Sequence, residues 1–261
     1  MSGGYRAIMN FFNLNGKVVL ITGASSGIGR ACAISVSQAG GSVIATGRNA
    51  ERLNDTRSKL TEGKHFSFVQ DLSDLAMTEQ NISIAVEAVG KISGFIHAAG
   101  IEQPMPFRQL TPDHYRKIYN INIIAGFELA RIISNKMFLS DSGGSFVFIS
   151  SVMGFLGKPG LVSYCSSKAA LLAGAKAMAL ELAPKKIRVN NILPGVIEDT
   201  EMTRNLFRML PEESLKDVIR MHPLGLGRTE DIALGCVFLL SDSARWITGA
   251  DIVIDGGYSA Q

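Results

Sequence analysis

Three side chains in one short stretch, Ser151, Tyr164 and Lys168, are of the types that proton transfer requires. Tyr164 and Lys168 are four residues apart, so their side chains share a face of the helix that the apolar spacing predicts over residues 163–183. A phenol has a pKa of about 10, and an ammonium about 4 Å away supplies roughly 4 kcal/mol toward lowering it. The helix N-terminus acts in the same direction. The pair is therefore predicted to act as a general acid and base near pH 7.

Ser151 follows an apolar, β-prone run at residues 146–149, and a strand ending there would place its hydroxyl beside the phenol. The alternative is that Tyr164 and Lys168 are an ordinary pair on a helix surface. With five tyrosines in the chain, one such spacing arises readily by chance. The choice depends on the elements that surround the three residues.

Length and composition predict a single domain with a full core. The chain has 261 residues, is 46% hydrophobic and carries a formal net charge of +3. The largest basic cluster is the pair Lys185 and Lys186, which predicts no nucleic-acid partner. Three cysteines, Cys32, Cys165 and Cys236, show no CxxC spacing and indicate a reducing, cytoplasmic location.

Neither the N-terminal residues nor the helix pattern indicates export or a membrane span. Residues 1–12 lack the apolar core of a signal peptide, so we expect residues 1–15 to be a flexible lead-in to one domain over 16–261. The longest apolar helix is interrupted by Lys176 and Glu181, short of the roughly 20 clean residues that a span requires. We expect a soluble protein without a membrane partner.

A glycine-rich turn between a predicted strand and a predicted helix indicates a nucleotide site. The apolar run at 17–22 is typical of a strand buried on both faces of a parallel sheet. Residues 22–29 then read TGASSGIG, and the missing side chains let the backbone approach a pyrophosphate at the helix N-terminus. Ser25 and Ser26 suit the N-cap of that helix.

The end of the next predicted strand, residues 42–46, bears on the choice of cofactor. An acidic residue there would bind the ribose 2′-hydroxyl of NAD. This chain has Gly47 followed by Arg48, whose guanidinium suits the 2′-phosphate of NADP. The sequence therefore favours NADP(H) over NAD(H). The alternative is a solvated arginine at the start of a helix.

The remaining chain alternates strands and helices. Further strands are predicted at residues 65–69, 94–97, 145–149, 187–193 and 251–254, and further helices at 74–89, 112–139 and 229–240. Thr111 and Pro112 give the helix at 112–139 a cap and a first residue. This alternation predicts an α/β fold, a single-domain doubly wound parallel sheet (Rossmann fold) of about seven strands with helices on both faces.

The segment 194–223 is the least regular, with Met202, Leu206 and Phe207 placed among charges. We predict a substrate lid there, since long loops are commonly functional and apolar groups can close over a bound molecule. The alternative is a pair of short amphipathic helices packed permanently on the body.

With these pieces in place, the sequence resembles the short-chain dehydrogenase/reductase family from Gly16 to Gly257, and is similar to its 3-oxoacyl-(acyl carrier protein) reductases. The family's motifs occur in order: the cofactor loop TGxxxGxG at 22–29, the adenine-contacting aspartate at Asp71, the active-site asparagine at Asn122, the serine at Ser151, YxxxK at Tyr164 and Lys168, the PG turn at Pro194 and Gly195, and the closing pattern at 247–257.

The resemblance implies that a nicotinamide passes a hydride to a carbonyl carbon while Tyr164 protonates the oxygen and Ser151 hydrogen-bonds it. It implies that Lys168 holds the nicotinamide ribose and lowers the pKa of Tyr164, and that Asn122 anchors a proton-relaying water. Asn122 has the alternative of bonding backbone within a bent helix, and the two roles can coexist. The cofactor contacts that the resemblance implies are Gly23, Ser25, Ser26, Gly27, Ile28, Gly29, Arg48, Asp71, Leu72, Ala98, Gly100, Tyr164, Lys168, Pro194, Gly195 and Ile197.

Three positions depart from the family's pattern. His97 opens the tetrapeptide at 97–100 where the family usually has Asn-Asn-Ala-Gly, and we expect a hydrogen-bonded histidine at a strand end rather than a catalytic one. Thr200 comes one residue later than the family's threonine. Ser26 stands where many NADP-using members carry a basic residue, so the NADP preference rests on Arg48.

The resemblance favours reduction of a ketone, and the substrate stays open. Apolar residues near the expected pocket suit an acyl chain, a steroid or a small cyclic ketone alike: Met153, Phe155, Leu156 and Met202. Basic residues that would favour an acidic acyl carrier protein are Lys158, Arg204 and Arg208. Polar residues that would suit a sugar or polyol are Glu102, Gln103 and Glu198.

A second class of function is a catalytically idle member that binds a nucleotide as a sensor or scaffold. The intact set Asn122, Ser151, Tyr164 and Lys168 argues against it. The histidines have no ligand-like spacing, so no metal is expected. The resemblance also implies a homotetramer formed through the helices predicted at 112–139 and 163–183.

Overall fold

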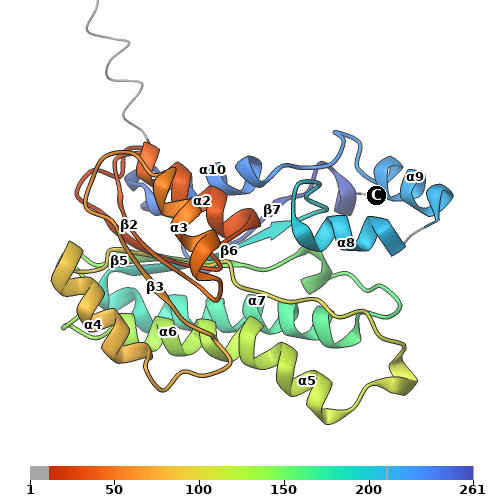
Figure 1. Ribbon diagram of the computed structural model, residues 1–261, viewed down its shortest axis with the longest axis horizontal. Helices are drawn as coiled ribbons and strands as arrows, with labels where there is room; N and C mark the ends of the chain where they lie inside the picture. The colour runs from red at the N-terminus through yellow and green to blue at the C-terminus, as the bar shows by residue number, and fades with distance from the viewer. Residues whose placement is uncertain (1–11, 210, 261) are drawn as a thin grey trace, which may run out of the picture.

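The computed structural model describes residues 12–209 and 211–260, and a seven-stranded sheet forms its centre (Figure 1). The strands are Val18–Thr22 (β1), Ser42–Gly47 (β2), Phe66–Val69 (β3), Gly94–His97 (β4), Gly144–Ile149 (β5), Ile187–Pro194 (β6) and Asp251–Ile254 (β7). Their order is β3-β2-β1-β4-β5-β6-β7, and every neighbouring pair is parallel. The predicted doubly wound sheet is confirmed. The strand order reverses between β1 and β4, and open α/β sheets bind ligands at the carboxyl ends of strands at such a point.

Helices cover both faces of the sheet (Figure 1). They are Gly27–Gln38 (α2), Ala50–Ser58 (α3), Thr78–Val89 (α4), Pro112–Tyr119 (α5), Ala125–Ile133 (α6), Val162–Leu182 (α7), Glu201–Met209 (α8), Glu212–Arg220 (α9) and Thr229–Leu240 (α10). One core lies under α2 and α10 and contains Val36 and Ile232. The other lies under α4, α6 and α7 and contains Leu129 and Leu171. All residues of β1 are buried, as the continuous apolar run predicted.

The single helix predicted over 112–139 is wrong in two respects. A π-helical segment, Asn120–Ile124, separates α5 from α6, and α6 ends at Ile133. A π turn inserts one residue into a helix that otherwise keeps its apolar stripe, so the periodicity of the sequence does not reveal it. Beyond α6 the chain returns toward the sheet, where the Phe138 carbonyl accepts the N–H of Ile92.

Two further boundaries differ from the prediction. The helix expected over 74–89 begins only at Thr78. Of the lead-in expected over 1–15, residues 1–11 lie outside the described residues. Leu14 is fully buried in the core, so the folded part of the chain begins before residue 16.

The segment predicted as a lid contains two helices, α8 and α9. Both have one apolar face, and three of their apolar residues, Met202, Leu206 and Val218, line a cavity at the carboxyl end of the sheet. This is the architecture of the alternative prediction, two short amphipathic helices on the body of the protein. None of the helices within residues 12–209 and 211–260 combines the length and apolarity that crossing a bilayer demands.

Candidate active site

A cavity of about 600 Å³ opens along the carboxyl ends of the central strands, a size typical of small-molecule and cofactor sites. The predicted site residues that line it are Gly23, Ser25, Ser26, Gly27, Ile28, Gly29, Arg48, Asp71, Leu72, Ala98, Gly100, Ser151, Tyr164, Lys168, Pro194, Gly195 and Ile197. Asn122 alone of the predicted set is absent from its lining. The fold thus brings residues from seven separate sequence regions to one space.

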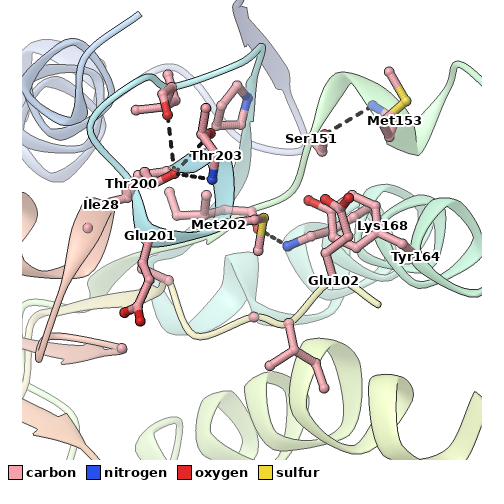
Figure 2. A pocket seen from close by; sticks show the side chains of 18 of the residues that line it. Ile28, Glu102, Ser151, Met153, Tyr164, Lys168, Thr200, Glu201, Met202 and Thr203 are labelled. Atoms are coloured by element: carbon pink, nitrogen blue, oxygen red, sulfur yellow. Dashed lines mark hydrogen bonds between the residues drawn. The ribbon is translucent and has the colours of Figure 1, made fainter. Parts of the chain in front are cut away.

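Tyr164 and Lys168 lie one turn apart on α7 and are almost enclosed, with exposed fractions of 7% and 5% (Figure 2). The Lys168 ammonium lies 5.6 Å from the centroid of the Tyr164 ring and donates to the Ile149 carbonyl at 2.8 Å. Ser151 follows β5 and caps a short 3₁₀ turn, where its Oγ accepts the N–H of Met153 at 3.1 Å. The strand and the helix therefore converge as the sequence predicted.

The electrostatics of the pair differ from the prediction. Burial raises the pKa of Tyr164, and the carboxylate of Glu102 raises it further, whereas a hydrogen bond with Ser151 lowers it. Burial lowers the pKa of Lys168 to about 8. The expectation that Lys168 brings the phenol pKa near 7 is wrong for the protein alone, because both groups lose water and the ammonium is directed at the Ile149 carbonyl. At neutral pH Tyr164 is a neutral phenol.

Asn122 lies at the centre of the π-helical segment and is fully buried. Its Oδ1 accepts the N–H of Ile101 at 2.8 Å, and its Nδ2 donates to the Ile101 carbonyl at 3.0 Å and to Ser167 Oγ at 2.9 Å. These bonds leave the helix and hold the loop after β4, so the alternative of bonding backbone within the helix is wrong. A methyl group built on Gly100 would lie 3.4 Å from Lys168 Nζ and 3.5 Å from Asn122 Oδ1. The missing side chain of Gly100 therefore leaves a gap between the two.

The glycine turn has the shape that a dinucleotide phosphate requires. A Cβ on Gly29 would lie 2.3 Å from the Gly23 carbonyl oxygen, and one on Gly23 would lie 2.9 Å from the Ala99 nitrogen. Gly23 also has a φ of +67°, which favours glycine. Ser26 occupies the N-cap position of α2 but its side chain makes no capping bond, so the predicted capping role is wrong. Ser26 and the first three residues of α2 line the cavity, so a helix N-terminus lies at its wall, which fits a nicotinamide dinucleotide.

Comparison with known proteins agrees with this geometry. A family model described as Enoyl-(Acyl carrier protein) reductase matches residues 23–259. The 3-oxoacyl-(acyl carrier protein) reductase FabG of Thermotoga maritima is 36% identical over 248 residues, covering 94% of this chain and 98% of that protein. The 2,5-dichloro-2,5-cyclohexadiene-1,4-diol dehydrogenase LinX of Sphingobium indicum is 36% identical over 249 residues, covering 94% and 97%.

A crystal structure of a putative short-chain alcohol dehydrogenase from Sinorhizobium meliloti 1021 superposes with a TM-score of 0.90 at 32% identity, covering 96% of this chain and 99% of that one. The chain belongs to the short-chain dehydrogenase/reductase family. It is similar to the family's 3-oxoacyl-(acyl carrier protein) reductases. The resemblance inferred from the motifs is confirmed.

In this dehydrogenase/reductase the end of β2 has no room for an acidic side chain. A Cβ on Gly47 would lie 2.9 Å from Ser25 Oγ and 3.0 Å from Ser25 Cβ. Arg48 follows at the cavity wall, and no described acidic residue forms an ion pair with it. Asp71 is held by Ser73, whose N–H and hydroxyl both donate to its Oδ1 at 2.9 Å, and these bonds lower its pKa. Arg48 lowers the pKa of Asp71 further.

His97 is a buried, hydrogen-bonded histidine, as expected from its place at the end of β4. Its Nδ1 lies 3.0 Å from Thr22 Oγ1 and its Nε2 3.1 Å from the Ile121 carbonyl. Burial lowers the pKa of His97 to about 3, so the ring is neutral. A neutral ring has one donor, which must serve the Ile121 carbonyl, leaving Nδ1 to accept from Thr22. His97 therefore ties β1 and β4 to the π-helical segment that carries Asn122.

The other positions singled out in the sequence divide between the cavity and its surroundings. Thr200 lines the cavity, and its Oγ1 accepts the N–H of Thr203 at 3.1 Å at the start of α8. Further residues that line it are Met153, Met202, Lys158 and Glu102. Residues absent from its lining are Phe155, Leu156, Gln103 and Glu198. Arg204 and Arg208 line a second cavity, between α2 and α8.

Sequence reasoning underrated Glu102. Its carboxyl group is half-buried in the cavity, and burial raises its pKa. The charges of Lys158 and Lys168 oppose that rise. Its place two residues after Gly100, in the loop that follows β4, was the available signal. No group of three or more His, Cys, Asp or Glu side chains suited to a metal ion occurs in the part of the chain that the structure describes.

Proposed function

We propose that this chain is an NADP(H)-dependent oxidoreductase that interconverts a carbonyl compound and a secondary alcohol. The observation that carries the proposal is that one cavity is lined both by the glycine turn and Arg48 and by Ser151, Tyr164 and Lys168. When bound, NADP(H) supplies or accepts the hydride. The described residues supply binding, orientation and the proton.

The cofactor would be held by residues already assigned from the sequence. Backbone N–H groups at the start of α2 would bind the pyrophosphate. Arg48 would pair with the 2′-phosphate, because its guanidinium is charged and forms no ion pair with a carboxylate of the described residues. Asp71 and Leu72 would contact the adenine. Pro194, Gly195 and Ile197 would contact the nicotinamide end of the cofactor.

Tyr164 is the proposed proton donor in the reductive direction. Its raised pKa keeps the proton on the phenol until negative charge develops on the substrate oxygen, which is then the stronger base. Ser151 would hydrogen-bond the same oxygen. Because Ser151 Oγ accepts the N–H of Met153, its own hydrogen is available to donate to that oxygen.

Lys168 and Asn122 have supporting roles in the proposal. The Lys168 ammonium uses one donor on the Ile149 carbonyl, which leaves two for the nicotinamide ribose and for proton relay. Asn122 fixes the loop after β4, and its Oδ1 and Lys168 Nζ flank the gap left by Gly100, where a water would complete the relay. A catalytically idle scaffold has no use for this arrangement.

The proposed substrate is a free small molecule rather than an acyl chain carried on a protein. An acyl carrier protein is acidic and would dock on basic residues at the cavity mouth. Of the three candidates only Lys158 lines the main cavity, whereas Arg204 and Arg208 line the second one. An acyl-carrier substrate remains the competing proposal, as FabG relatives bear that name.

Assembly, location and lid movement are also proposals. Exposed apolar residues on the helices that the family uses for assembly, Ile124 at 50% and Leu180 at 80%, support a homotetramer. The three free cysteines support a cytoplasmic location. The apolar residues of α8 and α9 on the cavity support a lid over the substrate. Light scattering of the purified chain tests the tetramer.

The test of the activity is Tyr164→Phe. We expect turnover of NADPH with a panel of ketones to fall by about three orders of magnitude or more, within the range attributed to acid–base groups and their partners. NADPH affinity, measured by fluorescence titration, should change little. Tyr115→Phe is the matched control, because Tyr115 lies on α5 away from the cavity. Equal turnover in parent and Tyr164→Phe would refute the mechanism.

A further inference from the structure

Glu102 lines the cavity that holds Tyr164 and Lys168, and nothing in the proposed mechanism uses its carboxyl group. Figure 2 shows its side chain next to those of Tyr164 and Lys168. The carboxylate is close enough to Tyr164 to raise the phenol pKa, and to Lys158 and Lys168 to feel both charges. Its carboxyl oxygens hydrogen-bond no other residue within the described chain. These oxygens are therefore available to accept a hydrogen bond from a bound substrate.

The backbone before Glu102 is fixed rather than loose. Both polar backbone groups of Ile101 are bonded to the side chain of Asn122, which is itself fully buried. Asn122 is anchored in turn to Ser167 of α7, the helix that carries Tyr164. The carboxyl group and the phenol are thus held in one frame, which is what recognition of a substrate requires.

The partner that satisfies Glu102 is a hydrogen-bond donor without charge. An acyl chain laid over the carboxyl group would remove its water and leave both oxygens unpaired, which is costly for a charged group. A cationic substrate would be repelled by the ammonium groups of Lys158 and Lys168, whose charges already act on the same carboxyl group. A neutral hydroxyl donates a hydrogen bond to the carboxylate, so it neither leaves the carboxyl oxygens unpaired nor is repelled by the ammonium groups.

The remaining lining of the cavity restricts the substrate further. Met153 and Met202 both contribute apolar surface to the cavity. A carboxyl group with these apolar side chains in the same cavity fits a compact ring or short chain with a second hydroxyl.

We propose that Glu102 determines specificity by accepting a hydrogen bond from a second hydroxyl of the substrate, beside the reacting carbon. The substrate class is then a cyclic or short-chain diol and the corresponding hydroxyketone. This inference rests on the proposed function, since it places the second hydroxyl beside the oxygen that Tyr164 serves. It names a residue and a recognition group that the family resemblance does not supply.

The test compares substrates that differ by one hydroxyl. With NADP⁺ the parent should oxidise trans-1,2-cyclohexanediol with a kcat/KM at least tenfold above that for cyclohexanol. In Glu102→Leu this ratio should fall tenfold or more, mainly through the KM of the diol. Glu102→Gln, which keeps an acceptor oxygen, should fall between the two. Gln103→Leu is the matched control and should keep the parent ratio, because Gln103 is not part of the cavity lining.

A second readout separates this inference from the proposed function. In the presence of NADP⁺, the diol should raise the melting temperature of the parent more than cyclohexanol does, and Glu102→Leu should abolish the difference. A parent that turns over alcohols but shows no preference for the diol overturns the inference alone. An unchanged ratio in Glu102→Leu does the same, as does an equal loss for both alcohols. A parent without turnover of any alcohol or ketone overturns the proposed function, and the melting shifts then decide the role of Glu102.

Discussion

Replacing Arg48 should reveal which dinucleotide the protein uses. Arg48 stands at the end of β2 where Gly47 has no room for the acid that would select NAD, and it lines the cavity. In Arg48→Ala the pairing with the 2′-phosphate is lost while the rest of the cofactor site stays intact. NADH lacks that phosphate, so its use should be nearly unaffected.

The size of the effect follows from the exposure of Arg48. A hydrogen bond to a charged group contributes about 1.5–3 kcal/mol, and an exposed ion pair about 0.2–1 kcal/mol. Arg48 is exposed, so about 1–2 kcal/mol is expected, and each 1.4 kcal/mol corresponds to about tenfold in affinity. We therefore expect kcat/KM with NADPH to fall roughly 5- to 30-fold in Arg48→Ala. In Arg48→Asp, repulsion of the phosphate adds to this loss and should reverse the preference for NADPH over NADH.

The assay is the ratio of kcat/KM values for NADPH and NADH with one ketone held constant. Arg57→Ala is the matched control, because Arg57 is an exposed arginine in the last turn of α3, the helix that follows Arg48, and does not line the cavity. The NADPH preference of the parent should also weaken at high salt, since an exposed pair is screened. A ratio that is the same in parent and Arg48→Asp would show that the end of β2 does not read the phosphate.

Two further predictions concern the fold around the site. Gly29→Ala places a methyl group 2.3 Å from the Gly23 carbonyl oxygen, so we expect about 1–3 kcal/mol of destabilisation in urea unfolding and weaker NADPH binding; Gly157→Ala, with open space, should show neither. The pKa of His97 is lowered to about 3 from an unfolded value of about 6.5, so the unfolded state binds more protons between these values. The free energy of unfolding should therefore decrease as pH falls below about 6.5, by up to about 1.4 kcal/mol per pH unit, and His97→Gln should lack this contribution; identical slopes in both proteins would contradict it.

The strands and the site motifs could be read from the sequence because their signals are local. A continuous apolar run such as that of β1 predicts a buried parallel strand, and the glycine turn and YxxxK spacing each lie within one strand–turn–helix or helix unit. The positions of Ser151, Tyr164 and Lys168 followed from those units. The structure brings these three residues to one cavity. This was to be expected, because parallel strands end at one edge of the sheet.

Features that depend on tertiary packing could not be predicted. The π-helical segment leaves the apolar stripe of α5 and α6 intact, so sequence periodicity showed one long helix. The bonds of Asn122 run to Ile101, 21 residues away, and no spacing rule links the two. The half-burial of Glu102 depends on the closure of the cavity by segments from other parts of the chain.

The error over the pKa of Tyr164 shows which physical effect controls this site. The four-residue spacing predicted the attraction between an ammonium and a phenolate. It could not predict that both groups would be buried and lose their water. Burial disfavours every charge, so it raises the pKa of Tyr164 and Glu102 and lowers that of Lys168. A site of this kind holds its proton on Tyr164 until a substrate oxygen becomes negative within it. Proton transfer from Tyr164 then moves the buried negative charge from the substrate oxygen to the phenol, and the Lys168 ammonium beside the Tyr164 ring stabilises the phenolate that results.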